Sequence, residues 1–289
     1  MIKYQNGNCS VSLDLSTGTK TRSWEGEPRP EFPESIDLKI TDYCDQACIF
    51  CHESSTVRGK HASIKNILSA VEGLPCGVEI AVGGGNPMSH PEIGKILFEL
   101  KRRHLVPNIT VHSQQVLDNF KTLKMFQEQT LVYGIGISCE EEGIPKVAFE
   151  KFKKLGPNVV FHVIAGIADP RNVVKYSNYL NKILVLGYKQ FGFGLKHFSP
   201  KVQNNLDQWK YWIGTVIRTV PHVSFDNLAL EQLAVKEVLN PILWDKHFMG
   251  EDGKYTMYVD AVKNEYAVSS ISERRSLENR TARDVFKLL

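Results

Sequence analysis

Six short strand-like runs alternate with stretches of helical periodicity between residues 35 and 200, and this alternation most constrains the fold. The strand-like runs are 35–41, 77–83, 107–112, 131–138, 157–165 and 189–195. The helical stretches between them are 62–73, 91–104, 116–127, 144–154 and 171–186. Strands that are each followed by a helix predict a parallel sheet, because right-handed helical crossovers return the chain to the same edge. The pattern therefore predicts an α/β fold, either a barrel or an open sheet.

The segments on either side of this alternation have a different character. Residues 2–22 predict a β-hairpin, because two strand-like runs flank a strong turn signal at Asn6-Gly7. The tail predicts a strand, a helix, a second hairpin and a short terminal helix that pack on the barrel. The expected units are an N-terminal hairpin and linker, a core, and a C-terminal extension, at 1–34, 35–200 and 201–289.

Composition and charge exclude several classes of protein. The 289 residues are 42% hydrophobic and 23% charged, which is the balance of a globular chain. The net charge of +3 does not indicate a nucleic-acid partner. We find no apolar stretch long enough to span a bilayer and no secretory signal, so we expect a cytoplasmic protein without a membrane partner. Six cysteines in such a chain more often serve metal binding or catalysis than disulfides.

Three of these cysteines form a compact array directly after the first predicted strand. Cys44, Cys48 and Cys51 have the spacing C-x3-C-x2-C. Thiolates are the usual ligands of iron–sulfur clusters, and three of them can hold three irons of a [4Fe–4S] cube and leave the fourth open to a small molecule. Tetrahedral zinc would need a fourth ligand, and His52 adjoins the array. Three buried free cysteines are the remaining alternative.

The array resembles the cluster motif of the radical S-adenosylmethionine (radical SAM) family, in which an aromatic residue, here Phe50, precedes the third cysteine. The resemblance implies a partial (β/α)6 barrel, here with the N-terminal β-hairpin and a C-terminal hairpin and helix extension. It implies one [4Fe–4S] cluster whose open iron binds S-adenosyl-L-methionine. An electron from a donor such as flavodoxin or ferredoxin would cleave SAM to methionine and a 5′-deoxyadenosyl radical, which abstracts hydrogen from the substrate.

A second motif, GGNP, follows the second predicted strand. Glycines at a strand end let backbone approach a ligand closely. In the family a Gly-Gly-Glu-Pro turn meets the amino group of SAM, so the resemblance implies that Gly84, Gly85 and Asn86 do so here. Asn86 stands at the acidic position, and its carbonyl oxygen accepts a hydrogen bond without the help of a charge.

Further SAM contacts are implied at the ends of later strands. Ser138 and Glu140 share one face by strand alternation, and Cys139 takes the other. Ser113 matches loosely a polar position after the third strand. Ala165 and Gly166 fall in the segment that reads adenine in the family.

The sequence does not decide the roles of three other polar residues. His162 in the fifth strand is either a core histidine or a ligand contact. Lys196 and His197 would end the sixth strand, at the catalytic side of a parallel barrel, where either is a candidate for contacting substrate.

The substrate is not determined by these motifs. A small molecule or nucleotide is slightly favoured, because the N-terminal hairpin looks too short for a peptide-recognition domain and the C-terminal hairpin holds no cysteine. A peptide or protein substrate is the first alternative. A non-catalytic iron–sulfur or SAM-binding module, or a structural zinc site, is the second.

Overall fold

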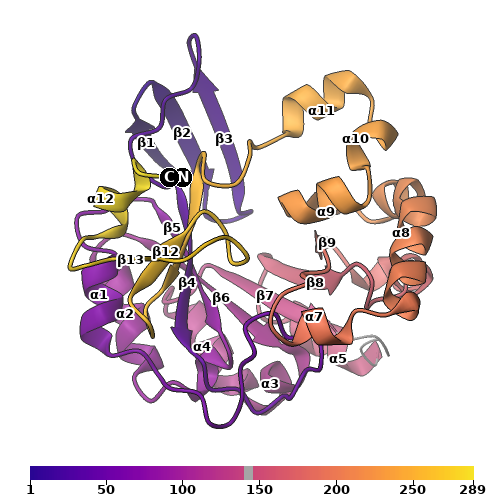
Figure 1. The fold of residues 1–289 in the computed structure, drawn as a ribbon, viewed down its shortest axis with the longest axis horizontal. Coiled ribbons are helices and arrows are strands. Elements are labelled where there is room, and N and C mark those ends of the chain that lie inside the picture. The colour runs from indigo at the N-terminus through magenta and orange to yellow at the C-terminus, as the bar shows by residue number, and fades with distance from the viewer. Residues whose placement is uncertain (140–145) are drawn as a thin grey trace.

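The computed structural model describes residues 1–139 and 146–289 and confirms an α/β architecture with a mostly parallel central sheet (Figure 1). In the described part of the chain this sheet has ten strands in the order β10-β9-β8-β7-β6-β5-β4-β11-β12-β13. The strands are β4 (Ser35–Thr41), β5 (Glu79–Gly84), β6 (Val106–His112), β7 (Gly134–Cys139), β8 (Val159–Ile164), β9 (Lys182–Leu186), β10 (His222–Phe225), β11 (Thr256–Asp260), β12 (Glu265–Ala267) and β13 (Arg275–Ser276). Neighbours from β10 to β11 are parallel, and β12 and β13 are antiparallel. The sheet curves as a partial barrel that does not close.

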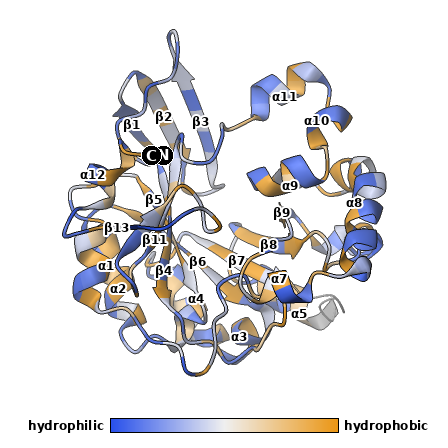
Figure 2. Cartoon of the chain, in the orientation of Figure 1, coloured by the Kyte–Doolittle hydropathy of each residue, from blue (hydrophilic) through white to orange (hydrophobic). Residues whose placement is uncertain are grey.

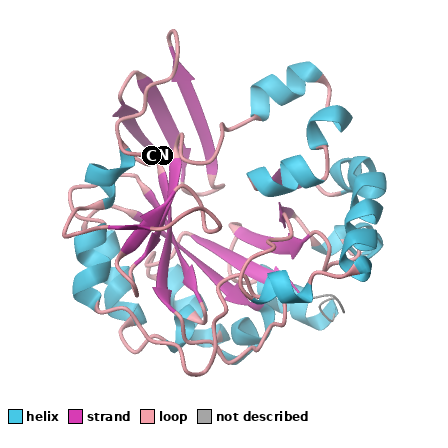
Figure 3. Cartoon of the chain, in the orientation of Figure 1, coloured by secondary structure: helices cyan, strands magenta, loops and turns pink. Residues whose placement is uncertain are grey.

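Most of the described helices lie around the outside of the curved sheet (Figure 3). The described helices are α1 (Ile64–Ala70), α2 (Ile93–Arg102), α3 (Ser113–Asp118), α4 (Phe120–Glu128), α5 (Lys146–Lys153), α6 (Pro170–Lys175), α7 (Phe193–His197), α8 (Pro200–Thr219), α9 (Asn227–Gln232), α10 (Val235–Val238), α11 (Pro241–His247) and α12 (Ala282–Phe286), with short 3-10 turns η1 (Pro87–Ser89) and η2 (Ser177–Tyr179). These helices carry both hydrophobic and hydrophilic residues (Figure 2). In α2 the buried residues recur at helical spacing, which fixes the face that packs on the sheet. They are Ile93, Ile96, Leu97 and Leu100.

The predicted sixth strand was wrong. The chain forms β9 at 182–186, inside the expected helix 171–186, of which only α6 and η2 are helical. An apolar run such as KILVL fits a buried helix or a buried strand, and its alternating burial shows that the strand prevails. Residues 189–195 form a loop and the start of α7, where Gly192 has a φ of +56°. Lys196 and His197 therefore lie on α7 and not at a strand end.

The N-terminal segment forms a three-stranded antiparallel sheet rather than a two-stranded hairpin. β1 (Ile2–Asn6) and β2 (Cys9–Asp14) meet at the predicted turn, and β3 (Thr19–Trp24) is added beside β2. Gly7 has a φ of +60°, and a Cβ there would lie 1.8 Å from a backbone oxygen. The sheet is tied to the barrel by Lys20, whose Nζ lies 2.5 Å from the Glu79 carboxylate.

The residues after 200 complete both ends of the central sheet. β10 pairs with β9 at one end, and β11 inserts beside β4 at the other. The second hairpin joins β11 to β12, and α12 provides the expected terminal helix. Among the described residues, no helix combines the length and apolarity needed to cross a membrane.

Candidate functional site

A cavity of about 1440 Å³ occupies the inner face of the curved sheet. It extends from the loop after β4 to α11 and to the turn between β2 and β3. Pockets for one small ligand are usually about 300–1,000 Å³, so this cavity has room for more than one molecule.

The loop of residues 42–61, here called the cysteine loop, brings Cys44, Cys48 and Cys51 to the wall of this cavity. Its backbone is held by local hydrogen bonds. The Cys44 N–H donates to the Thr56 carbonyl at 3.0 Å, and the Cys51 N–H donates to the Cys48 carbonyl at 3.1 Å. The Phe193 N–H at the start of α7 donates to the Cys51 carbonyl at 2.9 Å, which closes α7 over the loop.

The three thiols have the character of a ligand set. None of them forms a disulfide, and each is partly exposed. Burial raises the pKa of the Cys44 thiol, and the nearby charge of Cys51 raises it further. Three soft donors on one loop at a cavity wall fit the ligand requirement of an iron–sulfur cluster with one open iron. In the part of the chain that the structure describes, no three His, Cys, Asp or Glu side chains converge on the position of a single metal ion.

A buried ion cluster lies behind the cysteine loop. The Lys39 Nζ on β4 contacts the carboxylates of Glu53 at 2.7 Å, Asp260 at 3.2 Å and Asp42. Glu53 also accepts a hydrogen bond from the Tyr258 hydroxyl at 2.8 Å. Burial disfavours the charged form of Lys39, but the carboxylates outweigh it and raise its pKa. The sequence gives no local signal for this cluster beyond strand alternation, which places Lys39 on the same face of β4 as Asp37.

The glycine turn is held against the start of the cysteine loop. The Gly85 N–H donates to the Thr41 carbonyl at 2.7 Å, and the Asn86 N–H donates to the Tyr43 carbonyl at 2.6 Å. Gly84 has a φ of +117°, and a Cβ there would lie 2.4 Å from the Thr41 carbonyl oxygen. Gly84 and Gly85 both line the cavity, so a backbone edge without side chains faces it.

Asn86 lies beneath this turn and is not among the residues that line the cavity. Its Oδ1 accepts a hydrogen bond from the Met88 N–H at 3.0 Å, and its Nδ2 donates to Asp45 at 3.2 Å. Gln115 donates to the same Asp45 oxygen at 2.9 Å. Asn86 thus joins the turn to the cysteine loop, and its contact with SAM stays a prediction.

The other predicted contacts divide into two groups. Phe50 and Ser138 line the cavity. Ser113 begins α3, Ala165 is completely buried and donates to the Leu186 carbonyl at 2.8 Å, and Gly166 has a φ of +93°; none of the three is a lining residue. Glu140 lies outside the described residues. The structure therefore brings Phe50, Ser138 and the glycine turn to the same cavity as the cysteines.

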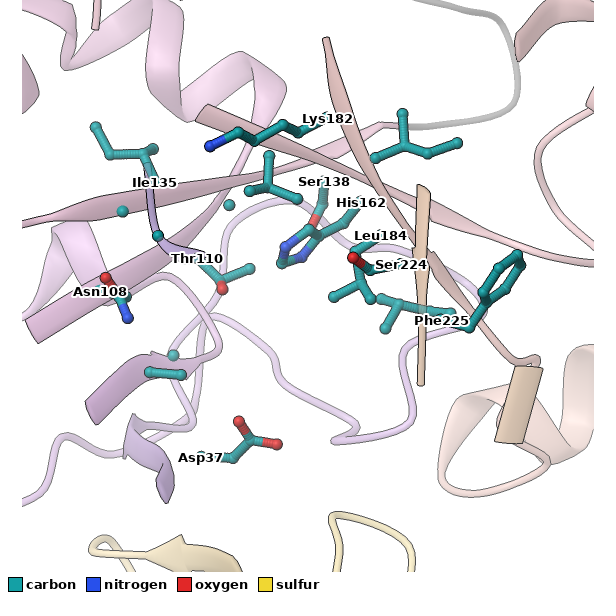
Figure 4. Close-up of a pocket in the computed structure, with 18 of the residues that line it drawn as sticks. Asp37, Asn108, Thr110, Ile135, Ser138, His162, Lys182, Leu184, Ser224 and Phe225 are labelled. Carbon is teal, nitrogen blue, oxygen red and sulfur yellow. The ribbon is translucent and has the colours of Figure 1, made fainter. Parts of the chain in front are cut away.

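The middle of the barrel carries a group of polar side chains, of which the sequence singled out only His162. Asp37, Thr110 and His162 project into a common space from β4, β6 and β8 (Figure 4). Gly136 on β7 makes room for the imidazole, since a Cβ there would lie 2.4 Å from its Cε1. Burial, with the charge of Lys189, lowers the pKa of His162 to about 4, so the ring is neutral near pH 7. His162 is thus a cavity residue.

Comparisons with known proteins agree with this geometry. The family model of the Radical SAM superfamily matches residues 38–178. The fold is similar to Streptococcus suis SuiB bound to the precursor peptide SuiA, with 13% identity, a TM-score of 0.63, and coverage of 89% of this chain and 65% of that one. SuiB bound to S-adenosylmethionine gives 12% identity and a TM-score of 0.59, covering 89% and 66%. This chain thus spans less than two thirds of the SuiB chains bound to peptide or to SAM. No curated protein matches the sequence.

Proposed function

This chain belongs to the radical SAM superfamily of enzymes, and we propose that it abstracts a hydrogen atom from a peptide substrate. Members of the superfamily use a [4Fe–4S] cluster and SAM. When bound, these cofactors supply the radical that removes hydrogen from an unactivated carbon. The protein binds and orients the cofactors and the substrate, and it excludes water from the site.

The residues at the cysteine end of the cavity have distinct tasks in this proposal. Cys44, Cys48 and Cys51 hold the cluster. The exposed backbone edge of Gly84 and Gly85 binds the polar end of SAM. A donor such as flavodoxin or ferredoxin delivers the electron, and the oxygen sensitivity of such clusters favours the cytoplasm.

The observation that carries the peptide substrate is the extent of the cavity. It continues from the cysteine loop past the inner face of the sheet to α11, and its volume of about 1440 Å³ exceeds the needs of SAM alone. The far mouth carries the exposed apolar side chains of Leu243 and Met249 on and beside α11. SuiB, which shares the fold, has been solved with a precursor peptide. We therefore prefer a peptide to the small molecule or nucleotide that the sequence slightly favours.

The cluster assignment is tested by anaerobic reconstitution with iron and sulfide. We expect roughly four irons per chain, because Cys9, Cys76 and Cys139 are too dispersed to hold a second cluster, and we expect 5′-deoxyadenosine after reduction in the presence of SAM. Cys48→Ala abolishes this product, whereas Cys76→Ala, which changes an exposed cysteine, leaves it unchanged. A colourless protein with one zinc, or full activity of Cys48→Ala, contradicts the assignment.

The substrate class is tested by isotope transfer. Short peptides encoded beside the gene are synthesised with deuterated side chains and incubated with the reduced enzyme and SAM. Deuterium in 5′-deoxyadenosine and a changed peptide mass identify the substrate. Deuterium transferred from a labelled metabolite or nucleotide, with none from any peptide, contradicts the peptide proposal.

A further inference from the structure

Asp37 is a carboxylate without a partner inside the barrel. It lies on the inner face of β4, lines the cavity, and points toward its centre (Figure 4). Within residues 1–139 and 146–289 the Asp37 carboxylate has no hydrogen bond and no ion pair. Its accessible surface lies in the cavity, where the surrounding protein still raises its pKa by burial.

The cations nearest to Asp37 are already engaged. Lys39, two residues along the same face of β4, contacts three other carboxylates. The Lys189 Nζ donates to the Ser270 hydroxyl at 2.7 Å, and its charge lowers the Asp37 pKa only in part against burial. The Asp37 carboxylate keeps accessible surface in the cavity, so a ligand that displaces water from it must replace that water as its partner. Among the described residues Asp37 therefore has no cationic partner, and a ligand can supply one.

The surroundings of Asp37 add negative potential. Asp226 and Asp252 both act on it and raise its pKa. Asp226 accepts backbone hydrogen bonds from Gly187 and Ala229, each at 2.8 Å, and Asp252 accepts one from the Asn227 side chain at 2.8 Å. These partners are neutral, and neither carboxylate lines the cavity, but both act on Asp37 through space. Their effect on Asp37 opposes that of Lys189, which favours a cationic ligand there.

The wall of the cavity at β9 suits a long aliphatic stem. Leu184 on β9, in register with His162, lines this part of the cavity (Figure 4). Lysine and arginine side chains bury their methylene groups on such surfaces and keep the charged head at a polar partner. The shape and the charge of this region therefore fit the same class of side chain.

We propose that Asp37 binds the ammonium or guanidinium group of a basic side chain in the substrate peptide and so selects where the peptide is modified. This inference rests on the proposed function, because it assigns the substrate residue of the same cavity. Asp37 is a specificity residue in this account: it pairs with the charged head and leaves the stem of the side chain in the cavity.

The test uses blocked tripeptides, acetylated and amidated, with a central lysine, arginine or norleucine. Norleucine keeps the stem of lysine and removes its charge. Dissociation constants are measured on the cluster-loaded enzyme with SAM bound. We expect lysine or arginine to bind about tenfold or more tightly than norleucine, the size of a hydrogen-bonded charge pair. Asp37→Asn removes this preference, and Asp37→Glu restores part of it. Asp207→Asn, a change of an exposed carboxylate, leaves the preference intact.

Two results overturn the inference: equal affinity of the wild-type enzyme for lysine and norleucine, including no binding of any tripeptide at millimolar concentration, or an unchanged preference in Asp37→Asn. Asp37→Lys adds a charge-swap arm, since it should prefer a central glutamate. Iron content and 5′-deoxyadenosine formation are recorded for each variant. A wild-type enzyme that cleaves SAM without a charge preference defeats only the inference about Asp37. A charge preference without SAM cleavage defeats only the proposed function.

Discussion

Lys39 and Asp37 lie two residues apart on one face of β4, yet their surroundings are opposite. Lys39 contacts three carboxylates near the cysteine loop. Asp37, deeper in the barrel, has no ion-pair partner among the described residues. Charges that hold a loop in place are paired within the fold, whereas an unpaired charge in a cavity can be paired by a ligand. The same strand thus supports the cysteine loop and presents an unpaired carboxylate to the cavity.

The ion cluster around Lys39 also explains why the C-terminal strands belong to the site. Asp260 and Tyr258 on β11 reach Lys39 and Glu53, and Glu53 lies two residues after Cys51. The Arg274 guanidinium lies 3.6 Å from the same Glu53 carboxylate. Chain segments separated by more than 200 residues therefore fix the position of the cysteine loop.

The largest effect on stability is expected from removing Lys39, the central cation of the ion cluster. Lys39→Met leaves Glu53, Asp42 and Asp260 close together without compensation, and we expect a loss of about 3–5 kcal/mol in the free energy of unfolding. Denaturant unfolding of the apoprotein measures it. The control is Lys210→Met, which breaks an exposed pair at 3.9 Å and costs less than about 1 kcal/mol. A loss for Lys39→Met no larger than that of the control means that the cluster does not hold the loop.

His162 provides the next test, in the middle of the barrel. Its pKa is about 4 when folded, against a usual value of about 6.5 when unfolded, so the unfolded chain binds more protons between these pH values. Acidification through this window therefore lowers stability, by up to about 3 kcal/mol. His162→Asn should flatten this part of the pH profile, and His104→Asn, at an exposed histidine, should not. Equal slopes in the wild type and in His162→Asn contradict the assignment of the shift to this ring.

A smaller loss of stability is expected from a substitution at Gly136, which leaves space for the His162 ring. In Gly136→Ala the new methyl would lie 2.4 Å from the His162 Cε1 and 3.1 Å from the Thr110 Oγ1, so the imidazole must move. Overpacking of this kind costs about 1–3 kcal/mol. The matched control is Gly83→Ala, because a Cβ at this glycine meets nothing within 4 Å. Adding His162→Ala to Gly136→Ala should recover part of the loss, and a purely additive double mutant would rule out the contact.

Local sequence signals predicted most of the barrel around the cysteine loop. The first five barrel strands, the cysteine loop and the glycine turn follow from periodicity and spacing, which are properties of neighbouring residues. The segment at β9 failed because an apolar run of five residues has no period that separates a helix from a strand. The third N-terminal strand was missed because its alternation of polar residues gives no hydrophobic signal.

Local signals could not predict that Lys39 is paired with carboxylates and that Asp37 is not. Alternation places both on the inner face of the first barrel strand, and this much was available from the sequence. The pairing of Lys39 depends on Asp260, which arrives through the insertion of β11 beside β4, and on Glu53, which Tyr258 of the same strand contacts. Pairing between residues so distant in the chain leaves no local pattern.

The smallest effect is expected at Cys139, which lies at the boundary between cavity and core. Ser138 is in register with His112 and His162 on the inner side, whereas Cys139 is in register with the buried Val163. The Cys139 thiol donates to the Ile137 carbonyl at 3.4 Å, and burial raises its pKa, so it stays protonated. Cys139 is half-buried: it packs against the core and also lines the cavity. We expect Cys139→Ala to keep most SAM cleavage and to lose about 1 kcal/mol of stability, the cost of a small buried side chain. The rate of 5′-deoxyadenosine formation, compared with that of Cys51→Ala, decides this. A loss in Cys139→Ala as deep as in Cys51→Ala would falsify the core role and assign the thiol to the reaction.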